Sequence, residues 1–128
     1  MITKLLSLVR KHAFFIFISY LLLILVLSFI TIQEVEVVDE TFDDKIFHCI
    51  AYFVMVVFAF NYTVKTSVKY APLLCSLFCF SYGTIIEILQ PRLSEYRAFD
   101  YYDIVANTLG IVFAVLAIIA FKNKVKIK

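Results

Sequence analysis

Polar side chains able to bind a ligand or move a proton occur at helical spacing in three apolar segments of the chain. Residues three, four or seven positions apart lie on one face of a helix, so each set points in one direction. Ionisable groups inside an apolar helix are costly unless they face a partner or a wet cavity. The sequence therefore predicts a single polar pocket shared by three helices. Its predicted members are Asp44, Lys45, His48 and Tyr52 from the first set, Glu87 and Gln90 from the second, and Asp103 and Asn107 from the third.

The residue types in this pocket favour acid–base chemistry combined with anion binding. His48, Glu87 and Asp103 are the candidate catalytic residues, because imidazole and carboxyl groups transfer protons at enzyme sites. Lys and Arg side chains hold phosphate groups, Arg in a bidentate manner. The candidate ligand-binding residues are Asp44, Lys45, Tyr52, Gln90, Arg92, Arg97 and Asn107.

The same residue types raise the question of a metal ion. One imidazole and two carboxylates, here His48, Glu87 and Asp103, can ligate several cations. Lys45 and Arg97 would oppose such an ion electrostatically. No metal site is therefore predicted, and no cofactor is expected.

Each pocket residue also has a purely structural explanation. Asp44 and Asp103 suit the start of a helix, where the macrodipole favours negative charge. Gln90 and Asn107 can form hydrogen bonds between helices, and a lone Tyr52 serves packing more often than chemistry. The functional interpretation is favoured because an acid, a titratable base and a fixed cation are expected in one place.

Four apolar segments must position these side chains: residues 13–32, 46–63, 71–89 and 104–121. Each approaches the length of about 20 residues that a membrane-spanning helix needs. Backbone groups have no water partners in lipid, so these segments must be helices. The first segment is predicted to be a helix that stays in the mature protein and is not cleaved off as a signal peptide. Its apolar stretch is longer than the roughly 7–15 residues of a signal peptide's apolar region. The prediction is one all-α domain over residues 1–128, an integral membrane four-helix bundle whose second, third and fourth helices form the pocket.

The distribution of charge predicts an orientation. All ten acidic residues lie in or beside two hydrophilic segments, and nine of the twelve basic residues lie in the others. Lys and Arg are retained on the cytoplasmic side of membranes. Both termini are therefore expected inside, with residues 33–44 and 91–102 outside. This orientation places the predicted pocket at the outer side of the membrane.

Membrane lipids or a lipid-linked cell-wall precursor are the expected partners. The basic tail from Lys122 to Lys128 adjoins the last apolar segment. That position favours anionic lipid headgroups over nucleic acid as the partner of its charges. No nucleic-acid partner is predicted, and the oligomeric state is left open.

The polar residues form one ordered series, Asp44-Lys45-x-x-His48-x-x-x-Tyr52, then Gly83-x-x-x-Glu87-x-x-Gln90, then Arg97, then Asp103-x-x-Ala106-Asn107-x-x-Gly110. The series resembles the VanZ-like family of small bacterial membrane proteins, over roughly residues 44–110 and three of the four predicted helices. The resemblance implies a multi-pass protein of the bacterial cytoplasmic (inner) membrane, and the family's namesake is linked to teicoplanin resistance. The Pro-Gly pair common before the family's arginine is missing, so Arg92 and Arg97 are both candidates. Arg97 is favoured because it lies six residues before Asp103.

Three functions compete at this point. The first is the binding or modification of a lipid or lipid-linked headgroup at the outer leaflet, with enzyme activity left open. The second is a non-enzymatic structural or assembly role in which the polar residues only lock the bundle. The third, a proton or ion pathway, is disfavoured because the inner half offers only Asn61, Thr63 and Ser76 among apolar residues.

The predicted topology can be tested by labelling engineered cysteines. In a cysteine-free background, Glu36→Cys and Glu95→Cys should both react with a membrane-impermeant maleimide in intact cells, because both loops are expected outside. Lys69→Cys, in the loop expected inside, is the matched control and should react only after permeabilisation. Reaction of either acidic-loop position only after permeabilisation would overturn the orientation.

Overall fold

The computed structural model describes residues 1–29, 42–64, 66, 68–93 and 99–125, and these residues form five α-helices and no strands. The all-α prediction is confirmed. The helices are α1 (Ile2–Lys11), α2 (Ala13–Phe29), α3 (Phe42–Thr63), α4 (Ala71–Leu93) and α5 (Tyr101–Val125).

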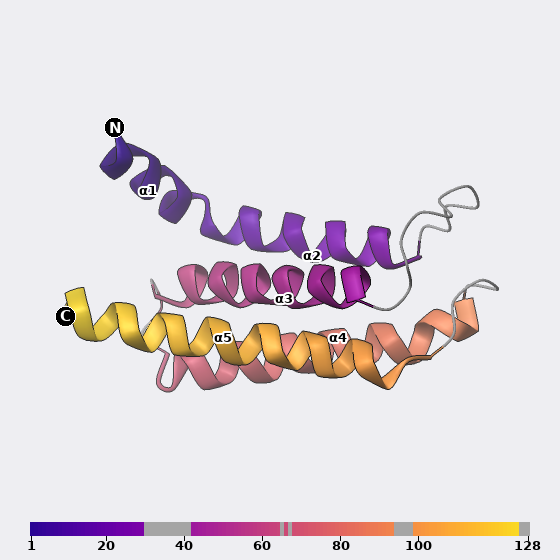
Figure 1. Ribbon diagram of the computed structural model, residues 1–128. Coiled ribbons are helices and arrows are strands. Elements are labelled where there is room, and N and C mark those ends of the chain that lie inside the picture. Colours follow the sequence, from indigo (N-terminus) through magenta and orange to yellow (C-terminus); the bar gives the residue numbers. More distant parts are fainter. Residues whose placement is uncertain (30–41, 65, 67, 94–98, 126–128) are drawn as a thin grey trace.

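Helix α3 lies at the centre of the arrangement. It contacts α2, α4 and α5, and its contact with α5 is the most extensive between any two helices described. Figure 1 shows α3 and α5 running in one direction and α2 and α4 running in the other. The starts of α3 and α5 therefore lie at the same end of the molecule as the end of α4, and α1 lies at the opposite end.

Three helices are long and apolar enough to cross a membrane, which fits a multi-pass membrane protein. The three candidate spans are Asp44–Thr63, Ala71–Leu93 and Tyr101–Lys122, and they correspond to the second, third and fourth predicted helices. A fourth span exists only if α1 and α2 are counted as one bent unit, so the four-helix bundle stays a prediction.

The first predicted helix agrees with α2 over its described residues, but a separate helix, α1, precedes it. Among the described residues α2 covers Ala13–Phe29, and α1 precedes it at an angle of 74°. Residues 30–32, the predicted end of this helix, lie outside the described residues. The two helices prefer different surroundings, because α1 is amphipathic whereas α2 is apolar on every side.

The boundaries of the other helices also differ from those predicted. Helix α3 begins at Phe42 rather than at residue 46, and α5 begins at Tyr101 rather than at residue 104. The third apolar helix was expected to end at residue 89, but α4 continues through Pro91 to Leu93. Because proline has no backbone N–H, the last turn of α4 lacks one i→i−4 hydrogen bond.

Hydroxyl groups attach α2 to its neighbours through backbone carbonyls. The Tyr20 hydroxyl of α2 donates a hydrogen bond to the carbonyl of Ala51 on α3 at 2.6 Å. In the reverse direction, the Tyr82 hydroxyl of α4 donates to the carbonyl of Leu21 on α2 at 2.5 Å. These bonds hold α2 against the pair formed by α3 and α4.

Both glycines of the chain lie where two helices approach closely. A Cβ atom at Gly110 would collide with the backbone carbonyl of Cys49, so the contact between α3 and α5 depends on glycine. A Cβ atom at Gly83 would lie 2.6 Å from the Tyr52 ring, which packs directly on the backbone of α4. The two glycines therefore set the spacing between the helices that carry the predicted pocket.

Replacing Gly110 by alanine should destabilise the protein even though alanine favours helix. Overpacking of a tight contact costs about 1–3 kcal/mol, which exceeds the gain of about 1 kcal/mol in helix propensity. Thermal unfolding in detergent should therefore occur at a lower temperature for Gly110→Ala than for the wild type. Leu109→Ala, at an exposed position of the same helix, is the control and should change stability less. A Gly110→Ala protein as stable as the wild type would contradict the close contact.

Candidate functional site

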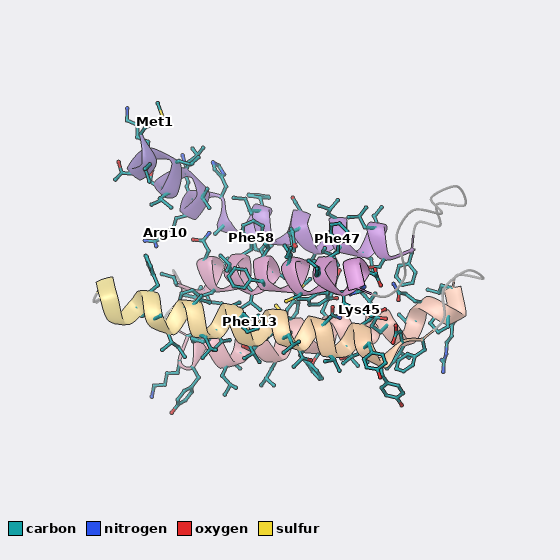
Figure 2. All side chains as sticks on the ribbon, viewed as in Figure 1. Met1, Arg10, Lys45, Phe47, Phe58 and Phe113 are labelled. Carbon is teal, nitrogen blue, oxygen red and sulfur yellow. The ribbon has the colours of Figure 1, made fainter. Side chains whose placement is uncertain are left out.

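One end of the molecule gathers the ionisable side chains of three helices. Because α3 and α5 run in the same direction and α4 runs against them, the first turns of two helices meet the last turns of the third. Figure 2 places Lys45 at this end, far from Met1. We call this group the polar cluster. Its members are Asp44, Lys45 and His48 of α3, Glu87 of α4, Asp103 and Asn107 of α5, and Asp100 directly before α5.

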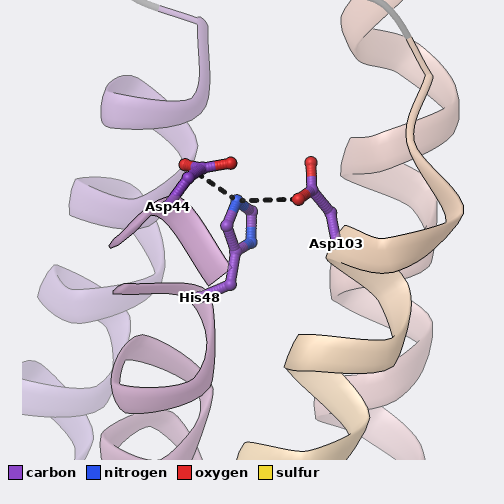
Figure 3. A group of neighbouring side chains, drawn as sticks. All are labelled: Asp44, His48 and Asp103. Carbon is purple, nitrogen blue, oxygen red and sulfur yellow. Dashed lines mark ion pairs between the residues drawn. The ribbon is translucent and has the colours of Figure 1, made fainter. Parts of the chain in front are cut away.

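The His48 imidazole lies at the centre of the polar cluster. Its Nδ1 atom is 2.9 Å from Oδ1 of Asn107 and 3.8 Å from Oε1 of Glu87. Its Nε2 atom is 3.7 Å from a carboxylate oxygen of Asp44 and 3.8 Å from one of Asp103, as Figure 3 shows. The structure thus brings all three predicted catalytic residues, His48, Glu87 and Asp103, into one group.

Lys45 connects α3 to α5. Its ammonium group donates a hydrogen bond to Asp100 at 2.7 Å and a second one to Asp103, and lies 3.5 Å from Asp44. An ammonium group has three N–H donors. Its role as a phosphate ligand stays a prediction, and a phosphate would have to compete with these carboxylates.

The deeper part of the polar cluster is closed to the surroundings. Glu87 is 1% exposed, Asn107 2% and Asp103 6%. Two buried polar atoms, Nδ2 of Asn107 and the hydroxyl oxygen of Thr84, have no hydrogen-bond partner among the described residues. Thr84 was not predicted as a site residue, because a single hydroxyl in an apolar helix gives no signal in the sequence.

The other predicted ligand-binding residues are distributed differently. The Tyr52 ring is 3% exposed and packs deeper in the bundle, against Gly83. Gln90 is turned towards α2, where its amide donates a hydrogen bond to the carbonyl of Ser28 at 3.1 Å. Arg92 is exposed in the last turn of α4 and forms no ion pair with a described residue. Arg97 lies outside the described residues.

Asp100 belongs to the polar cluster although it was not predicted there. Its side chain caps α5, since Oδ1 accepts a hydrogen bond from the Tyr102 N–H at 2.9 Å. The hydrogen bond from Lys45, followed by that from Tyr102, holds the pKa of Asp100 below its usual value. An Asp directly before a helix is a recognised start signal, which would have indicated both the helix start and this residue.

Carboxyl groups outnumber cations in the described part of the polar cluster. Asp44, Glu87, Asp100 and Asp103 surround one ammonium group and one imidazole. Such a surplus favours a ligand that carries a positive charge or donates hydrogen bonds.

A metal ion is a special case of such a ligand. Asp44, His48 and Asp103 each offer a ligand atom, and the three atoms lie within 4.8 Å of one another. This set differs from the sequence-based one in having Asp44 in place of Glu87. The Lys45 ammonium contacts both carboxylates and opposes a second cation there.

No protein-family model, no curated protein and no solved structure matches this chain. The resemblance to the VanZ-like family therefore rests on the ordered motif alone and stays a prediction.

The Lys45–Asp100 contact should make stability depend on pH in the acid range. The pKa of Asp100 is lowered in the folded protein, so the contact contributes its full stabilisation at pH values above the ordinary pKa of 3.8. The stabilisation is lost as pH falls through the lowered pKa, because the carboxylate then becomes protonated. Asp100→Asn should therefore reduce the free energy of unfolding at pH 7, by less than about 1 kcal/mol because the side chain is partly exposed. The difference from the wild type should disappear in strong acid. Denaturant titrations of both proteins across pH measure it.

Tyr102→Phe is the matched control, since it alters the neighbouring side chain but leaves the charges and the capping N–H in place. The free energy of unfolding of Tyr102→Phe should differ from that of the wild type by the same amount at every pH. A deficit of Asp100→Asn that persists unchanged in strong acid would contradict a stabilising carboxylate.

Proposed function

We propose that the polar cluster binds the headgroup of a membrane lipid or of a lipid-linked cell-wall precursor at the outer side of the bacterial cytoplasmic membrane. The observation that carries the proposal is the contact between His48 and Glu87, at 3.8 Å, with Glu87 only 1% exposed. Ionisable residues buried between apolar helices are expensive, and function is their usual justification. The polar cluster also lies at helix ends, the depth at which lipid headgroups are found.

Acid–base chemistry would be available to a bound headgroup. When Nδ1 of His48 donates its proton to Oδ1 of Asn107, Nε2 is left as an acceptor. A hydroxyl or ammonium group of a ligand can then donate to Nε2 or to the carboxylates of Asp44 and Asp103 beside it. The proposal is therefore a binding site equipped for proton transfer.

The charges favour a headgroup that carries both signs. Surplus carboxylates attract an ammonium or hydroxyl group, while a phosphate needs a separate cation. Arg92 is exposed on the last turn of α4, at the same end of the molecule. Arg97, the candidate that the motif favours, lies outside the described residues, and either guanidinium can hold a phosphate in a bidentate manner. Teicoplanin resistance is linked to the namesake of the family that the chain resembles, and the resemblance alone does not transfer that phenotype to this chain.

A structural role is the second candidate, and one observation favours it. Lys45 is paired with Asp100 and Asp103 across the contact between α3 and α5. Buried charges that satisfy one another can serve to fix the arrangement of helices rather than to bind a ligand. Under this alternative the polar cluster locks the bundle in an assembly or structural protein.

Native mass spectrometry separates the two candidates. Phosphatidylethanolamine, phosphatidylglycerol and a polyprenyl phosphate are titrated against the wild type, Glu87→Gln and His48→Ala. The proposal expects at least one lipid to lose about tenfold or more in affinity in both variants, since hydrogen bonds to charged groups contribute roughly 1.5–3 kcal/mol. Both variants should remain folded, as judged by gel filtration and thermal unfolding.

Thr108→Val is the matched control, because the Thr108 hydroxyl donates only to the carbonyl of Ile104 on its own helix. It should bind every lipid like the wild type. Unchanged lipid binding in folded Glu87→Gln and His48→Ala would contradict the proposal. Failure of both variants to accumulate as folded protein would instead support the structural lock.

A further inference from the structure

Helix α1 has two chemically distinct faces. Ile2, Leu5, Leu6 and Val9 recur at the i, i+3, i+4 and i+7 positions, so they lie along one side. The opposite side carries Lys4, Ser7 and Lys11, with Thr3 and Arg10 flanking it. The helix contains no acidic residue. It therefore combines a continuous apolar strip with a polar side whose charged residues are all basic.

The apolar strip is not covered by the rest of the protein. Ile2 is 75% exposed, Leu5 61% and Leu6 62%, and no residue of α1 is buried. Exposed apolar surface of this kind marks a contact with another apolar phase or partner. The occupant must also accommodate the positive charges on the other side of the helix.

The position of α1 indicates what that occupant is. Helix α2 runs alongside the spans and α1 bends away from it, as Figure 1 shows. The angle between the two helices is 74°. The bend between α1 and α2 lies level with the ends of the spans. Asn61, near the end of α3, donates a hydrogen bond from Nδ2 to the carbonyl of Val9 at 3.4 Å. If the spans cross a bilayer, α1 runs nearly parallel to its surface, at the depth of the interface.

Further basic residues lie at the same end of the molecule. Lys69 is exposed in the connection between α3 and α4, and the ammonium of Lys122 lies 4.7 Å from the Phe60 ring near the end of α3. Clustered Lys and Arg residues beside membrane spans attract anionic lipids. The charges of α1 thus lie at the same end of the molecule as Lys69 and Lys122.

We propose that α1 is an interfacial helix that lies in the membrane surface opposite the polar cluster. Its apolar strip enters the boundary between headgroups and acyl chains, and Lys4, Arg10 and Lys11 contact anionic headgroups. The proposal is independent of the function assigned to the polar cluster. It gives the protein a second lipid contact, selective for negative charge, on the other side of the membrane.

Tryptophan fluorescence tests the proposal, since the natural chain contains no Trp. The full-length variants Leu6→Trp and Ser7→Trp are reconstituted into vesicles whose lipids carry bromine either near the headgroup or deep in the acyl chain. The Trp at position 6 should be quenched by the shallow bromines and emit at shorter wavelength. The matched Trp at position 7, one residue along but on the polar side, should be quenched much less.

The selectivity for charge is tested in the Leu6→Trp protein. Adding phosphatidylglycerol to phosphatidylcholine vesicles should increase shallow quenching, and Lys4→Gln with Lys11→Gln should remove this increase. Equal quenching at both Trp positions by deep bromines would show that α1 continues α2 as one bent span and would overturn the proposal. Absence of quenching at both positions would also overturn it, and indifference to phosphatidylglycerol would overturn the preference for anionic lipid.

Discussion

The close approach of α3 and α5 is the constraint on which the rest of the structure depends. Gly110 lets the backbone of α5 rest against the carbonyl of Cys49. Since the two helices run in the same direction, this contact also fixes which residues face each other nearer the starts of both helices. Asn107 meets His48, and Asp103 meets Lys45. A packing contact between apolar surfaces therefore determines the geometry of the polar groups, because it fixes the register in which they face each other.

Much of the fold and part of the site could be predicted because they depend on patterns repeated along the sequence. Helices α3, α4 and α5 follow from long apolar segments. The polar residues at helical spacing within each segment predicted a shared group, and His48 does lie beside both Glu87 and Asp103. Features that depend on one residue or one contact were less predictable. The first apolar segment begins at Ala13 as expected, but its pattern did not predict that a separate helix, α1, precedes it at 74°. Gln90 of α4 bonds to α2 because the carbonyl of Ser28 lies within reach of its side chain. Asp100 was missed because the start of α5 was expected three residues late.

The described polar cluster balances its charges only in part. Lys45 neutralises carboxylates at its more exposed edge, while His48 contacts both Asn107 and the buried Glu87. A cluster evolved only for stability could be replaced by apolar packing at little cost. The presence of several ionisable groups between apolar helices thus gives the functional interpretation its weight, and the surplus of carboxylates defines the sign of charge that a ligand must bring.

The hydrogen bonds that attach α2 have a consequence for how this helix tolerates sequence change. Leu21 and Ser28 accept through their backbone carbonyls, which every amino acid supplies. These two bonds therefore do not depend on which side chains the acceptor residues carry, although Leu21 also packs in the hydrophobic core. The donors Tyr82 and Gln90, and Tyr20 on α2 itself, have no such freedom, because each bond requires that particular side chain. Natural variation should accordingly be narrow at these donors and broad at the exposed positions of α2.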